Sequence, residues 1–72
     1  MTLAHAAPTL RVERKSSRGW EEVAPAWSMH QALRILTSRR GHLETVRIWD
    51  LRGQREYLRV RPGDDWEYEV WR

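Results

Sequence analysis

Arginine and aromatic residues alternate in the second half of the chain, and this pattern is the one best suited to binding chemistry. Arg47 and Trp49 stand two residues apart, and Tyr57, Arg59 and Arg61 repeat that spacing further on. A guanidinium group donates paired hydrogen bonds and stacks on aromatic rings, and aromatic rings stack on bases or anchor protein interfaces. We therefore predict a partner-binding surface that contains Arg47, Trp49, Arg59 and Arg61.

The same residue types also allow an arrangement within the molecule. Arginine stems can cover aromatic rings, and across neighbouring strands they can pair with carboxylates such as Glu67 and Glu69. In that case the surface would stabilise the fold and would not bind a partner. The sequence leaves both arrangements open.

A second candidate surface lies on a predicted helix. Gln31, Arg34 and Ser38 follow one another at spacings of three and four, which places them on one side of a helix, and they lead toward Arg39 and Arg40. We predict that Gln31, Arg34, Arg39 and Arg40 contact a partner. A helix face that is only solvated would have a similar composition.

No catalytic or metal-binding arrangement can be assembled from the sequence. His5, His30 and His42 lack the spacing of a metal site, and the chain has no cysteine. The adjacent acids Glu21-Glu22 and Asp64-Asp65 would point apart on a strand. There is neither a nucleophile elbow nor a glycine-rich phosphate loop. We therefore expect no enzyme activity, no bound metal and no cofactor.

Length and composition describe one small basic domain. The chain has 72 residues and a net charge of +3, and Lys15 is the only lysine among its 13 basic residues. Residues 52–61 are basic and residues 62–72 are acidic, a polarity that suits an acidic partner. No apolar run is long enough to cross a membrane, and residues 1–9 do not resemble a signal peptide. We expect a cytoplasmic protein with a loose arm at 1–9 and one α+β domain at 10–72.

The predicted helix has a signal at each end. Ser28 is a favourable N-cap, and Gln31, three residues later, completes a capping box. Gly41 is a typical residue just beyond a C-terminus. The pattern predicts a helix over Met29–Arg40, with a buried stripe of Met29, Ala32, Leu33 and Leu36.

Alternation of apolar and polar residues predicts five strands. Two precede the helix, over Leu10–Arg14 and Trp20–Val23, and Pro25 should end the second because proline lacks the N–H of a ladder bond. Glycine-containing turns at 52–53 and 62–65 separate the strands after the helix. Those strands are predicted over Thr45–Leu51, Gln54–Arg61 and Trp66–Trp71.

The predicted architecture is α+β, with the element order β-β-α-β-β-β. The strands form an antiparallel sheet of four to five strands, with one α-helix packed on one face. Alternate side chains point to opposite faces. The face toward the helix should carry Val46, Ile48, Leu58, Val60, Trp66, Tyr68 and Val70. The opposite face should carry Arg47, Trp49, Tyr57, Arg59, Arg61, Glu67, Glu69 and Trp71.

Several short motifs occur together in residues 27–70. They are Ser28-x-x-Gln31-Ala32-x-Arg34-Ile35, Thr45-Val46-Arg47-Ile48, Gly53, and Gly63 with Trp66. In this order the segment resembles the small type I anti-CRISPR proteins of phages and mobile elements, which include inhibitors of the type I-F system. The resemblance implies a helix, a two-stranded hairpin and a last strand that follows a glycine.

The resemblance also implies a partner. Proteins of this family bind CRISPR effector (Cas) proteins, the backbone subunits of the type I surveillance complex (Cascade), and occupy the groove where target DNA pairs with the guide. They present basic residues from the helix and the hairpin. Arg34 matches a basic helix position, whereas Leu33 and Ser38 stand where two further lysines are expected. Arg39 and Arg40 could supply that charge one turn later.

Two other functions fit the same residues. A small nucleic-acid-binding or regulatory module would use the arginine- and tryptophan-rich face on phosphates and bases. A homodimeric structural accessory protein would bury that face between two copies. Direct binding to nucleic acid should weaken steeply with salt, whereas a packed protein interface should not. The sequence is compatible with a monomer and with a homodimer.

Overall fold

The helix and strands follow the predicted order as far as the described residues extend. The computed structural model describes residues 7–39 and 44–63. Its elements are β1 (Leu10–Ser16), β2 (Gly19–Ala26), α1 (Met29–Ser38), β3 (Val46–Asp50) and β4 (Arg55–Val60). The predicted strand over Trp66–Trp71 lies outside the described residues.

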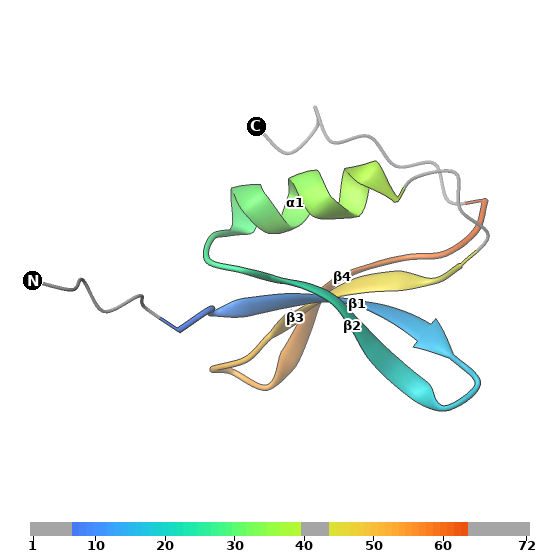
Figure 1. The fold of residues 1–72 in the computed structure, drawn as a ribbon, viewed down its shortest axis with the longest axis horizontal. Coiled ribbons are helices and arrows are strands. Elements are labelled where there is room, and N and C mark those ends of the chain that lie inside the picture. Colours follow the sequence, from blue (N-terminus) through green and yellow to red (C-terminus); the bar gives the residue numbers. More distant parts are fainter. Residues whose placement is uncertain (1–6, 40–43, 64–72) are drawn as a thin grey trace, which may run out of the picture.

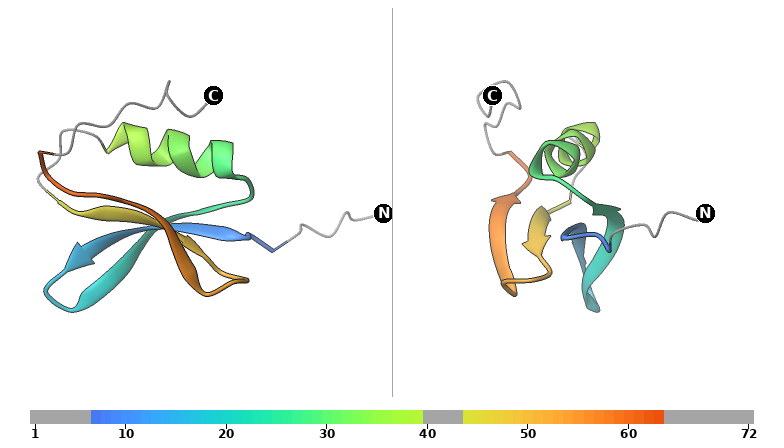
Figure 2. Two further views of the ribbon diagram at one scale, coloured as in Figure 1. Left: turned by 180° about the vertical axis from the view of Figure 1, so that it is seen from behind. Right: turned by 90° about the vertical axis from the view of Figure 1, so that its left-hand side faces the viewer.

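The four strands form one antiparallel sheet in the order β2-β1-β3-β4. The β1–β2 hairpin and the β3–β4 hairpin meet where β1 pairs with β3. Figures 1 and 2 show α1 along one face of this sheet, and the twist of the strands carries the two hairpin ends apart on the side away from α1. The structure confirms the predicted α+β class and the helix on one face of an antiparallel sheet.

The hydrophobic core lies between α1 and the strands β1, β2 and β3. None of the eight core residues is more than 5% exposed. Leu58 and Val60 of β4 pack only at the margin of this core and are half-buried. The core residues are Leu10, Val12, Ala26, Ala32, Leu33, Leu36, Val46 and Ile48.

The N-terminus of α1 carries the predicted cap with one difference. The Ser28 hydroxyl accepts the N–H of Gln31 at 3.1 Å. The side-chain carbonyl of Gln31 accepts the N–H of Trp27 at 2.8 Å. The reciprocal bond therefore goes to the residue before the N-cap and not to Ser28 itself, yet two backbone donors at the helix start are still satisfied.

The helix ends two residues earlier than the sequence predicts. The Thr37 hydroxyl donates to the Leu33 carbonyl at 2.8 Å, and the Ser38 hydroxyl donates to the Ile35 carbonyl at 2.6 Å. Such local hydroxyl bonds compete with the backbone ladder, and Arg39 leaves helical geometry at φ −97° and ψ 3°. The predicted helix over Met29–Arg40 was therefore too long at its C-terminus.

The buried stripe of α1 is also shifted from the prediction. Met29 is 36% exposed, so its predicted burial was wrong. Side chains of a helix lean toward its N-terminus, which carries the first residue of α1 beyond the end of the core. Ile35 instead packs against the core from the other flank of the stripe.

The prediction that Pro25 ends the second strand was wrong. Pro25 lies inside β2 and pairs with Arg11, and β2 continues to Ala26. Because β2 is an edge strand, a residue without an N–H costs no ladder bond if its nitrogen faces outward. Thr9, the last residue of the predicted arm, extends this pairing because its N–H donates to the Ala26 carbonyl at 3.2 Å.

The turn between β3 and β4 is organised by Asp50. Its carboxylate accepts the N–H of Arg52 at 3.0 Å, and its carbonyl accepts the N–H of Gln54 at 2.9 Å. A hydrogen bond from the Gly53 backbone holds the pKa of Asp50 below its ordinary value of 3.8. Burial acts in the opposite direction, but hydrogen bonds from Arg52 and Tyr57 and the charge of Arg55 lower the pKa further. A Cβ on Gly53 would overlap the Asp50 carboxylate, so a larger residue there would displace that carboxylate from the Arg52 N–H.

Replacing Gly53 by alanine should therefore lower the free energy of unfolding by about 1–3 kcal/mol, the usual cost of depriving a buried polar group of its hydrogen bond. Urea denaturation followed by circular dichroism measures the change. The exposed neighbour Arg52 provides the control, because only its backbone N–H takes part in the turn, so Arg52→Ala should change stability by less than about 0.5 kcal/mol. Equal effects of the two substitutions would contradict the steric explanation.

Candidate functional site

The sequence-predicted binding residues lie on opposite sides of the sheet. Gln31 and Arg34 are exposed on α1, which covers one face. Arg47 and Trp49 alternate with the buried residues of β3 that face α1, so they lie on the other face. Arg59 is the cross-strand partner of Arg47 and shares that face. These residues therefore form two separate surfaces, one on α1 and one on the outer face of the sheet.

The outer face of the sheet holds a closed cluster around Arg47. Its guanidinium carbon lies 3.9 Å from the ring centroid of Trp20 and 4.3 Å from that of Trp49. Its Nε donates to the Glu13 carboxylate at 2.8 Å. With its side chain only 13% exposed and paired with Glu13, Arg47 is used within the molecule. The predicted carboxylate partners Glu67 and Glu69 lie outside the described residues.

Glu13 is the centre of charge in this cluster and is only 3% exposed. One carboxylate oxygen lies 2.8 Å from the Nε of Arg11 and the other lies 2.8 Å from the Nε of Arg47. A buried carboxylate is tolerated in a folded protein when it is paired in this way. Sequence reasoning missed Glu13 and Trp20, because nothing local in the sequence brings Glu13 beside a residue 34 positions away.

The aromatic rings of β2 and β4 are also covered by arginines. The Arg59 guanidinium lies 5.1 Å from the Trp20 centroid, and its Nε donates to Glu56 at 2.7 Å. The Arg55 guanidinium lies 4.9 Å from the Tyr57 centroid and donates to the Tyr57 hydroxyl at 3.2 Å. An arginine therefore lies over each of the rings of Trp20, Trp49 and Tyr57, although Tyr57 remains 45% exposed.

Within residues 7–39 and 44–63, all of the acids but only some of the basic residues take part in ion pairs. Every carboxylate there belongs to an ion pair, namely Glu13, Glu21, Glu22, Glu44, Asp50 and Glu56. In the same ranges four cations have no ion pair: Lys15 and Arg18 at the β1–β2 turn, Arg34 on α1, and Arg52 in the β3–β4 turn. The described part of the molecule has no acid left to neutralise them.

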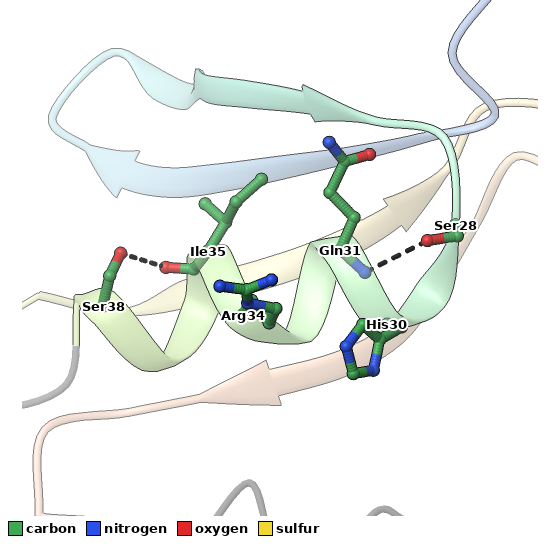
Figure 3. A pocket seen from close by; sticks show the side chains of 6 residues that line it. All are labelled: Ser28, His30, Gln31, Arg34, Ile35 and Ser38. Atoms are coloured by element: carbon green, nitrogen blue, oxygen red, sulfur yellow. Dashed lines mark hydrogen bonds between the residues drawn. The ribbon is translucent and has the colours of Figure 1, made fainter.

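Arg34 stands at a hollow of about 600 Å³ on the outer side of α1. Figure 3 shows Arg34 projecting from the middle of the helix, with Gln31 and Ile35 on one side of it and His30 on the other. The hydroxyls at the two ends are already bonded to the helix backbone. The described residues that line the hollow are Ser28, His30, Gln31, Arg34, Ile35 and Ser38.

Arg39, Arg59 and Arg61 are not among the residues that line this hollow. Arg39 donates from its Nε to Glu44 at 2.7 Å, and a second ion pair joins Glu44 to Arg14 at 3.7 Å. The charge of Arg39 is therefore neutralised within the molecule by Glu44. Arg61 is exposed just beyond the end of β4, and Arg40 lies outside the described residues.

The chemistry of these surfaces is that of binding groups. Within the described ranges, no three His, Cys, Asp or Glu side chains come together as metal ligands, and no helix there is long and apolar enough to cross a membrane. Comparison of the chain with protein-family models, with curated proteins and with solved structures finds no match in any of the three. The residues and their geometry are therefore the basis for the function proposed below.

Proposed function

We propose that this chain is an anti-CRISPR inhibitor that acts in the cytoplasm of a host bacterium. It binds a type I CRISPR effector complex (Cascade), through the backbone Cas subunits, and blocks the binding of target DNA. Two things support this proposal: the resemblance of residues 27–70 to small type I inhibitors, and the unpaired cations of a domain whose described acids are all paired. Arg34 carries the argument, because it is exposed on α1 and has no ion pair with any acid of the described ranges.

Binding accounts for these groups better than catalysis does. Arginines keep their charge at any physiological pH, so they suit recognition and not proton transfer. The cations without an ion pair lie at three separate places, two turns and one helix. Charges spread in this way over a small domain steer it to a complementary surface and raise the association rate.

Arg34 and Gln31 are the contact residues that we favour. Both are exposed and both line the hollow on α1, whereas the side chain of Arg47 is largely covered. A groove that binds DNA carries cations of its own, so these residues must pair with acids that lie beside those cations. In this proposal Arg47 and Trp49 keep the sheet rigid and do not contact the partner.

Charge reversal at Arg34 tests the proposal. Purified type I complexes would be captured with immobilised wild-type protein, and target DNA bound beforehand should reduce the capture because the two sites overlap. Arg34→Glu should weaken capture at least about tenfold, because like charges would face each other at the interface. Arg18→Glu is the matched control, since it changes the net charge equally at the β1–β2 turn.

The proposal fails if no type I complex is captured by the wild-type protein. It also fails if Arg34→Glu and Arg18→Glu weaken capture equally, since a general charge effect would then explain both. A folded variant is verified by its far-UV circular dichroism before capture.

A nucleic-acid-binding module is the second candidate, and the β1–β2 turn favours it. Lys15 and Arg18 are exposed there without an ion pair, and Arg14 has only long ion pairs of 3.7 and 3.8 Å. Phosphate contacts need such point charges. If the protein binds bare DNA with a steep salt slope and captures no CRISPR complex, this module replaces the inhibitor.

A further inference from the structure

The outer side of α1 combines an unmet positive charge with an adjoining apolar residue. Arg34 is exposed and has no ion pair with any acid in the described ranges. Ile35 beside it is half-buried, with part of its side chain against the core. Both line the hollow of about 600 Å³ shown in Figure 3. The hollow can therefore hold an anionic group and an aliphatic group side by side.

Two polar side chains beside Arg34, those of Gln31 and Ser28, still have protons to donate. The side-chain carbonyl of Gln31 already accepts the Trp27 N–H. The NH₂ group of the same amide is therefore the part that can donate to a ligand. The Ser28 hydroxyl accepts the N–H of Gln31 and keeps its own proton, whereas the Ser38 hydroxyl already donates its proton to the Ile35 carbonyl. The α1 sequence from Met29 to Ser38 contains no acid. A ligand in this hollow would therefore meet the Arg34 guanidinium and the donors of Gln31 and Ser28, and no carboxylate of the helix would repel it.

We propose that this hollow binds an acidic segment of a partner protein, with one carboxylate paired to Arg34 and a neighbouring aliphatic side chain on Ile35. A guanidinium binds a carboxylate in a planar, two-bonded geometry, and the Gln31 amide stands one helical turn away as a further donor. The inference deepens the proposed function, because it names the chemistry that the partner must present to α1.

The shape of the site favours a protein segment over a nucleic acid. A phosphate backbone is recognised by cations that follow it along a track. Arg34 is the one arginine among the described residues that line the hollow, and an aliphatic side chain adjoins it. A single guanidinium beside an apolar contact matches one acidic residue followed by one aliphatic residue.

A peptide titration tests this inference without any CRISPR complex. The probe is a blocked hexapeptide of alternating glutamate and leucine, added to ¹⁵N-labelled full-length protein, with the glutamine–leucine peptide as its uncharged match. The glutamate peptide should shift the amide signals of residues 28–38, and the glutamine peptide should bind at least about tenfold more weakly, because it loses the charge-assisted bonds. Arg34→Glu should abolish the shifts.

Two further variants sharpen the result. Arg34→Lys should keep weak binding, since an ammonium group lacks the paired geometry of a guanidinium. Arg18→Glu should bind like the wild type, because that residue lies at the β1–β2 turn. Shifts confined to the β1–β2 turn, or equal binding by wild type and Arg34→Glu, would overturn the inference.

The acids of residues 64–69 give one more outcome. A full-length variant with Asp64, Asp65, Glu67 and Glu69 changed to their amides removes those charges from the chain. If the peptide binds only this variant, the occupant of the hollow is the chain's own acidic end, and the assignment to an outside partner is wrong. If the peptide binds the wild type but no type I complex is captured, this inference holds while the proposed function fails.

Discussion

Replacing Glu13 by alanine is expected to lower the free energy of unfolding by about 3–5 kcal/mol, the usual cost of removing one partner from a buried ion pair. Glu13 is 3% exposed, and its two oxygens neutralise Arg11 and Arg47. Without it, the guanidinium of Arg47 would remain between two tryptophan rings with no counterion. Urea denaturation measures the loss, and near-UV circular dichroism should report the changed packing of the rings.

Glu22 provides the matched control for Glu13. It carries the same charge and pairs with Arg11 at 3.8 Å, but its side chain is 51% exposed. Exposed ion pairs contribute less than about 1 kcal/mol, so Glu22→Ala should leave the unfolding midpoint nearly unchanged. If the two substitutions destabilise the protein equally, the buried pairing of Glu13 is not what stabilises the outer face of the sheet.

Leu36→Ala is expected to cost about 2–5 kcal/mol, because a fully buried leucine leaves a cavity that the core fills only in part. Leu36 is 2% exposed and is among the largest fully buried side chains of the described core. Domains of this size have little stability in reserve, so the variant should be largely unfolded at moderate urea concentrations. The measurement is the midpoint and slope of urea denaturation.

Met29 is the control that separates the structure from the sequence pattern. Met29 and Leu36 belong to the same predicted stripe of the helix, but Met29 is 36% exposed. Met29→Ala should therefore cost less than about 1 kcal/mol. A large loss with Met29→Ala, or a small loss with Leu36→Ala, would contradict the packing of α1 on the sheet.

Residues close together in the sequence were sufficient to predict where the helix begins and which face of a strand is buried. The start of the helix follows from the Ser28 hydroxyl, which accepts the N–H of Gln31 as predicted, while the Gln31 side chain accepts the N–H of Trp27 instead of that of Ser28. The alternation of Val46 and Ile48 with Arg47 fixed which face of β3 is buried. These features depend on residues close in sequence, whose geometry is set by the helical and strand periods.

The order of the strands in the sheet decided what the sequence could not. Pro25 is accepted within β2 because β2 lies at an edge, which depends on which strand pairs with which. The same holds for Leu58, which is only half-buried because α1 lies over the other three strands. A local pattern gives the face of a residue, but the position of its strand in the sheet determines how much of that face is covered.

For the candidate site too, the sequence predicted the kinds of residue involved, and the tertiary structure determined how they are arranged. The sequence by itself identified arginines and tryptophans as the groups able to bind, and it identified Gln31 and Arg34 as exposed on one side of a helix. Only the tertiary structure separated these residues into two surfaces and enclosed Arg47 between Trp20 and Trp49 above Glu13. The physical reason is that a charge pair of this kind forms between strands distant in sequence, so its partners are set by the register of β1 against β3.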